Sequence, residues 1–351
     1  MKTRWMKSTI AMLLVMMVIV TGCGAKASPK QAAVDAFAKS MEVESYAFQA
    51  SVNLEELELS GDEFADPQMA GILEMIKTAK LDISGIVQQE PLQMEMKLGV
   101  EIPGDMAIKF ELPIIMTDTK MYLKVPNIPM LGLPETVVSK YLEFDLEELA
   151  EQSGQSMNSI TDLQTAQKFS NEFFTEVVSK FDEKLYFSEV AVKDAKLPEG
   201  VDAKQVVKFA VTKDNFDQAA TTLVKDALPA LLDLMSKEEY RTYFDIEQSE
   251  IDDLKKELSD SNSTLKEDLE ELKKTLTVNE LSILTAINKD GYPTYQKFVG
   301  DVNANSEGSE MKLKFNLSMT MTNINGKQEF SSIPTDTLTE EEFEAALYGG
   351  Y

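Results

Sequence analysis

The residue with the most distinctive chemistry is Cys23, the only cysteine in a chain of 351 residues. It ends the segment Val20-Thr21-Gly22-Cys23, directly after an uncharged run that extends from Ile10 to Val20. Three cations, Lys2, Arg4 and Lys7, precede that run. A charged start, a short apolar run and small residues before a cleavage point are typical of an export signal. The run is also short for a membrane span, which needs about 20 apolar residues.

The end of this segment resembles the lipobox of bacterial lipoproteins, in which the peptide is cut before the cysteine and the thiol is acylated. The resemblance implies a signal peptide over 1–22, a mature chain that begins at an acylated Cys23, and a tether over 23–30. The alternatives are an ordinary signal peptide with an incidental cysteine, or an uncleaved anchor. A free thiol would be a reactive liability in an exported protein. We therefore expect a lipid-anchored protein on the extracytoplasmic face of the cell membrane.

The chain lacks the residues that most catalytic mechanisms require. There is no histidine, and the one cysteine is used for the anchor. This excludes a histidine general base, a thiol nucleophile and a zinc site of the usual ligands. Carboxylates are abundant and act in pairs in glycosidases, so a hydrolase remains a third-ranked hypothesis. We expect no enzyme, no catalytic residue, no metal and no cofactor, and we interpret the calcium-loop-like Asp301–Glu307 as part of a hairpin.

The charge of the chain limits its partners. Asp and Glu number 60 against 34 Lys and Arg, a net charge of −26 at pH 7. Nucleic acid is excluded as a partner, because phosphate contacts need clustered cations. An acidic body is also repelled by anionic lipids, so we expect attachment to depend on the acyl chains.

Long alternating patterns indicate strands with one apolar face. The clearest alternate from Leu92 to Ile102 and from Met311 to Met321, and a phase slip at Glu55-Glu56 suggests a bulge in the strand from Tyr46. Shorter patterns are 81–87, 108–114, 121–125, 142–146, 185–192, 207–211, 281–287 and 295–299. Helical spacing occurs at 31–40, 160–181, 215–235 and 251–276, and Pro229 should kink or break the third of these helices. The turns at Asp290-Gly291 and Asn325-Gly326 are typical of hairpins. The patterns predict an α+β fold: a large curved antiparallel sheet of about ten strands, a half-barrel with helices packed on its concave face.

Methionine is unusually frequent, with 19 residues, and several fall on predicted strands. Its flexible, polarisable side chain suits surfaces that accept apolar ligands of varied shape, although core filling is the commoner role. The candidates for lining a ligand site are Met94, Met96, Leu98, Phe110, Met121, Leu313, Phe315, Met319 and Met321.

The lipobox, a short helix, one-faced strands, intervening helices and closing strands together resemble the lipid-binding lipoproteins of the LolA, LppX and LprG type. The similarity is greatest to the poorly characterised branch of Gram-positive bacteria. It implies one half-barrel domain over 31–335, with a charged helical pair near 247–276 as an elaboration and an acidic tail over 336–351. The helical pair is either cover for the sheet or a binding arm.

The leading hypothesis is a non-catalytic lipoprotein that binds an apolar or amphiphilic, lipid-like molecule between sheet and helices. The alternative is a cell-envelope interaction or sensory module with a filled core and no small-molecule ligand.

Overall fold

A computed structural model describes residues 27–61, 67–103, 107–128, 132–153, 163–260, 264–306 and 309–348. The predicted signal peptide and Cys23 lie outside these residues, so cleavage and acylation stay predictions.

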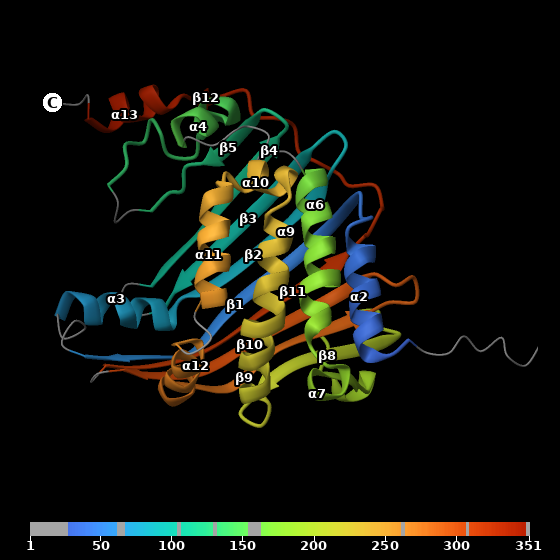
Figure 1. Ribbon diagram of the computed structural model, residues 1–351. Coiled ribbons are helices and arrows are strands. Elements are labelled where there is room, and N and C mark those ends of the chain that lie inside the picture. Colours follow the sequence, from blue (N-terminus) through green and yellow to red (C-terminus); the bar gives the residue numbers. More distant parts are fainter. Residues whose placement is uncertain are drawn as a thin grey trace, which may run out of the picture.

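One open sheet of twelve strands organises the fold, with the order β12-β6-β5-β4-β3-β2-β1-β11-β10-β9-β8-β7 (Figure 1). All neighbours are antiparallel except β12, which pairs in parallel with β6. The strands are β1 (Ser45–Ser60), β2 (Lys80–Gln88), β3 (Gln93–Ile102), β4 (Ile108–Thr117), β5 (Lys120–Lys124), β6 (Tyr141–Asp145), β7 (Phe187–Val190), β8 (Gln205–Thr212), β9 (Leu276–Ile287), β10 (Pro293–Ser306), β11 (Ser309–Thr322) and β12 (Thr337–Leu338). The predicted α+β class is confirmed, with twelve strands in place of about ten.

The long helices lie over one face of the sheet, in front of the strands in Figure 1. The α-helices are α2 (Pro29–Ser40), α3 (Pro67–Thr78), α4 (Leu146–Ser153), α6 (Leu163–Glu172), α7 (Glu183–Tyr186), α8 (Phe216–Thr222), α9 (Leu228–Met235), α10 (Glu238–Phe244), α11 (Gln248–Asp260), α12 (Thr264–Thr275) and α13 (Glu340–Tyr348). Short π-helical turns, η3 (Phe173–Val177) and η6 (Leu223–Ala227), follow α6 and α8, and the 3₁₀ turns are η4 (Val178–Lys180) and η5 (Val192–Asp194). Helices α2, α7, α8 and α12 contact the sheet on β7 to β10, whereas α6, α9, α10 and α11 contact one another.

The structure tests two local predictions, the bulge in β1 and the strand over 185–192. The bulge in β1 is confirmed by a register shift between Leu54 and Glu56. The strand predicted over 185–192 is wrong at its start, because Asp182 accepts hydrogen bonds from the Lys184 and Leu185 amides and begins α7. Such a cap satisfies amide groups that a helix leaves free.

Two further differences concern Pro229 and a predicted hairpin. The π turn η6 precedes Pro229 and joins α8 to α9 without a break, since a wider turn accommodates the missing proline amide. The turn at Asn325-Gly326 is present but joins no hairpin, because the chain leaves β11 there and next pairs at β12 beside β6. The acidic carboxy-terminal segment contains β12 and α13.

The calcium-loop-like segment belongs to the hairpin of β10 and β11, as predicted. Its residues 301–306 pair in register with 309–314 of β11. The charged helical pair forms α11 and α12, of which α11 contacts α9 and α12 contacts β9 and β10. Ile251 of α11 is fully buried, so α11 packs against the helix layer, and the choice between cover and binding arm for the pair stays a prediction.

Candidate functional site

The face of the sheet beneath the helices carries continuous rows of apolar side chains. Directly opposed residues of paired strands point to the same face, so the register defines each row. One row crosses nine strands through Phe187, Phe209, Ile283, Phe298, Leu317, Val52, Leu81, Val100 and Phe110. A second row contains Met321, Phe48, Gly85, Met96, Ile114, Leu123 and Leu142. We call this surface the apolar sheet face.

Over β1 to β4 and β11, the opposite face is polar and carries exposed ion pairs; we call it the polar face. Lys97 lies 3.2 Å from Glu111, and Lys312 lies 2.6 Å from Glu58. Since the ladders alternate between the two faces, the sheet separates an apolar surface from a charged one.

The structure brings all nine predicted lining residues to the apolar sheet face, on β3, β4, β5 and β11. Every one of them is half-buried. Among the described residues, the clusters of fully buried apolar side chains lie elsewhere: two join helices to β7–β9, one lies beside β6, and one centres on Val206 on the opposite face of the sheet. The nine residues therefore form a surface that solvent reaches. Their role as ligand contacts stays a prediction.

Six methionines gather at one end of the apolar sheet face. Met94, Met116 and Met121 share a row with Tyr46, the adjacent row contains Met96 and Met321, and the row after that contains Met319. Burial raises the pKa of the Tyr46 phenol, which stays neutral and able to donate a hydrogen bond. This end thus combines adaptable apolar side chains with one hydroxyl, a combination that suits an amphiphile.

Tyr46, Phe48 and Met116 are not among the residues that the sequence predicts for the site. Their pairing with predicted residues depends on strand neighbours that alternation alone cannot assign. Met116 did carry a signal, because it continues the alternation of Leu112 and Ile114.

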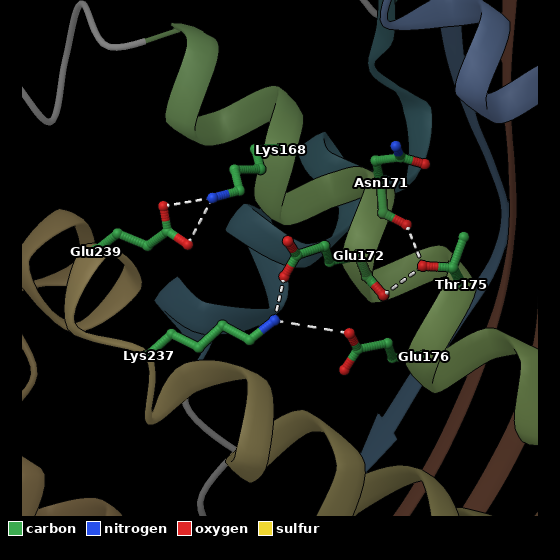
Figure 2. A network of polar contacts seen from close by, with 7 residues as sticks. All are labelled: Lys168, Asn171, Glu172, Thr175, Glu176, Lys237 and Glu239. Carbon is green, nitrogen blue, oxygen red and sulfur yellow. Dashed lines mark hydrogen bonds and ion pairs between the residues drawn. The ribbon is translucent and has the colours of Figure 1, made fainter.

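A polar network holds the helix layer together above the sheet (Figure 2). Lys237, which precedes α10, contacts Glu172 of α6 at 2.5 Å and Glu176 of η3 at 3.6 Å. Lys168 donates two hydrogen bonds to Glu239, of 2.7 and 2.8 Å. Burial opposes the charge of Glu172, but Lys237 outweighs it and lowers the pKa of that carboxyl.

Aromatic packing also joins α6 to α10. Phe169 of α6 makes edge contacts with Tyr240 and Phe244 of α10, with ring centroids 5.1 and 4.7 Å apart. Tyr240 is fully buried, and burial, together with the Glu172 carboxylate beside its hydroxyl, raises its pKa. Aromatic contacts and ion pairs therefore both join α6 to α10.

Two pockets lie away from most of the nine candidates. One, of about 510 Å³, separates β6 and α4 from α13 and is lined by six acidic residues, Glu143, Asp145, Glu148, Glu340, Glu341 and Glu344. The other, of about 450 Å³, lies largely on the polar face near Ser331 and includes Met96 alone of the nine. Ser331 holds the carboxy-terminal segment there by hydrogen bonds to Glu95.

The described residues contain no group of three or more His, Cys, Asp and Glu with the geometry of a metal site. Within the same residues, no helix has the length and apolar composition to cross a membrane.

Comparison with models of protein families and with curated proteins finds no match. Among solved structures, the chain resembles lipovitellin, from a structure concerned with lipid–protein interactions. The TM-score is 0.23 at 7% identity, over 83% of this chain and 26% of lipovitellin.

Proposed function

We propose that this protein is a lipid-anchored extracytoplasmic lipoprotein that binds a lipid-like amphiphile on the apolar sheet face. The main support for the proposal is that apolar side chains form continuous rows across that face. Nine residues selected from the sequence lie together there, half-buried, outside the clusters of buried side chains. An apolar surface of this kind under a helix layer favours an occupant, because exposing it to water costs about 25 cal/mol per Å².

The sequence around Cys23 supports the proposed acyl anchor. Such an anchor would hold the protein at the membrane surface. The resemblance to LolA, LppX and LprG type lipoproteins supports the same class of ligand. The methionine-rich end with Tyr46 favours an amphiphile over a pure hydrocarbon, because one hydroxyl there can meet a polar group.

The test compares two neighbouring residues of β3 that point to opposite faces. Met96→Gln changes the apolar sheet face, and Lys97→Gln makes the same product residue on the polar face. Losing the burial of one methionine costs about 1.5 kcal/mol or more, so Met96→Gln should weaken binding of a fluorescent fatty acid at least about tenfold. Lys97→Gln should bind as the wild type does.

Native mass spectrometry of the purified protein provides a second readout, with a copurifying lipid as the expected result. An empty mass spectrum together with no fatty-acid binding would overturn the ligand proposal. That outcome would favour the interaction module with a filled core.

A further inference from the structure

One row of the apolar sheet face contains two polar side chains at neighbouring positions. Thr285 of β9 pairs with Gln296 of β10, and the row continues to Val207 on one side and to Met319 of the methionine-rich end on the other. Val207 packs in a buried cluster beneath α2. Since directly paired residues share one face of a sheet, Thr285 and Gln296 also lie on the side that the helices cover.

Neither polar side chain has a hydrogen-bond partner within the described part of the chain. Thr285 is only 8% exposed, and Gln296 is half-buried. By contrast Thr294, which lies in the same hairpin and is 7% exposed, donates a hydrogen bond of 2.7 Å to the Asp202 carbonyl. Buried polar groups are almost always paired, so two unpaired ones side by side indicate that a ligand supplies their partners.

The chemistry of the pair limits the headgroup of such a ligand. Threonine and glutamine side chains both donate and accept hydrogen bonds, so the headgroup needs donors as well as acceptors. An anionic headgroup only accepts, and burying it would require a nearby cation. The two lysines of α2 are already engaged, because Lys30 donates to the Ser179 and Phe181 carbonyls and Lys39 pairs with Glu42. The pair therefore favours an uncharged headgroup with hydroxyl and carbonyl groups.

Apolar surface for an acyl chain begins directly beyond the pair. Phe298, two residues after Gln296 on the same face of β10, is 37% exposed. Leu281 of β9, which pairs with Gly300, is 40% exposed and lies one row farther on. A molecule with an uncharged head and an acyl tail matches this sequence of polar and apolar side chains.

We propose that Thr285 and Gln296 form the headgroup subsite of the apolar sheet face and that the ligand is an uncharged acylglycerol-type lipid. The proposal rests on the proposed binding of a lipid-like amphiphile and names its chemical class. Hydroxyl and ester groups of the lipid complete the hydrogen bonds of the two side chains, and the acyl chain lies along Phe298 and Leu281.

The experiment compares two ligands with the same acyl chain, monooleoylglycerol and ionised oleate, as competitors of a bound fluorescent fatty acid. Thr285→Val and Gln296→Met each replace a polar side chain by an apolar one of similar size. Each variant loses about one hydrogen bond to the uncharged headgroup, so it should bind monooleoylglycerol about fivefold or more weakly than the wild type does. Both variants should bind oleate as the wild type does.

The melting temperature of the delipidated protein gives a second readout, which distinguishes a ligand contact from a structural residue. Thr285→Val removes an unpaired hydroxyl from a buried position, so it should raise the melting temperature by about 2 °C. Thr294→Val is the matched control, because its hydroxyl is equally buried but paired. It should lower the melting temperature.

Each other outcome contradicts a defined part of the proposal. Unchanged binding of monooleoylglycerol, or equal losses for both ligands, would overturn the headgroup subsite and leave lipid binding intact. A larger loss for oleate would overturn the uncharged class. A lower melting temperature of delipidated Thr285→Val would show that this hydroxyl serves the fold and not a ligand. A wild-type protein that binds no fluorescent fatty acid would overturn the proposed function and the subsite together.

Discussion

Two glycines on the apolar sheet face lie opposite phenylalanines of the neighbouring strand. Gly85 pairs with Phe48, and Gly300 pairs with Phe315. A Cβ added at Gly85 would lie 2.9 Å from the Phe48 ring and also clash with the Glu95 backbone carbonyl. At Gly300 the three atoms nearest the added Cβ all belong to the Phe315 ring, with Cζ at 2.7 Å. Each glycine thus leaves room for the phenylalanine ring of the paired strand, which lies over the glycine.

This arrangement predicts an order of destabilisation. Overpacking costs about 1–3 kcal/mol, and Gly85→Ala should lie at the upper end because a backbone carbonyl cannot turn away. Gly300→Ala should cost less and be relieved by Phe315→Leu, whose side chain is smaller and flexible. Gly71→Ala, which meets open space inside α3, should stabilise the chain by about 0.5–1 kcal/mol. Urea unfolding of the four proteins measures the order, and equal losses at Gly85 and Gly300 would contradict the role of the carbonyl.

For single residues, the sequence predicted which ones lie on the apolar sheet face but not which residues of the neighbouring strands they pair with. Alternation assigns Met94 and Met319 to an apolar face whatever strand lies beside them. It cannot assign Phe48 to Gly85, because that pair depends on which strands meet. The ring-on-glycine contacts therefore required the structure.

Among the helices, the network around Lys237 is the main polar link between α6 and the start of α10. The Lys237 side chain is 40% exposed and that of Glu172 25% exposed, so solvent screens part of the attraction. The pKa of Glu172 is lowered from its ordinary 4.5, so its contribution to stability is present above 4.5 and lost as pH falls through the folded value. The pKa of Lys237 is raised from 10.5, so its contribution is lost only as pH rises through a still higher value.

We therefore expect Lys237→Met to lower the melting temperature at pH 7 and to have little effect near pH 3. A partly exposed pair contributes up to about 1 kcal/mol, which corresponds to about 2 °C in a chain of this size. Lys168→Met is the matched control, because its pair with Glu239 is 53% and 40% exposed and should contribute less. Thermal melts at both pH values measure the difference. An effect of Lys237→Met that persists at pH 3 would show that lost packing, not charge, is responsible.

Element boundaries show where sequence patterns stop being sufficient. The β1 bulge was predictable, since the apolar phase itself shifts at Glu55. Helix α7 was not, because Leu185 and Tyr186 fit a strand as well as a helix until the Asp182 cap decides between them. Pro229 likewise predicts a break, but only packing decides that a π turn absorbs it.

The fold class of the whole molecule was predictable because long one-faced strands require antiparallel pairing. The order of the strands was not. Strand β1 lies at the centre, between β2 and the late strand β11, so the carboxy-terminal hairpin completes a sheet begun at residue 45. Alternation carries no information about pairs so far apart in sequence.

The net charge of −26 acts on the molecule as a whole. Its ion pairs on the polar face are exposed, as Lys314 and Glu55 are at 3.1 Å, and such pairs contribute little. Self-repulsion among the excess carboxylates should therefore outweigh them.

Sodium chloride shortens the Debye length to about 10 Å at 0.1 M and screens that repulsion. We expect the melting temperature at pH 7 to rise with salt, because relief of the net repulsion exceeds the loss of exposed pairs. The control is the same titration near the isoelectric point of about 4.4, where the net charge vanishes and the rise should disappear. A melting temperature that falls with salt at pH 7 would mean that the ion pairs dominate. If it rises, the same net charge would repel anionic lipids, so the proposed attachment to a membrane would depend on the proposed acyl chains.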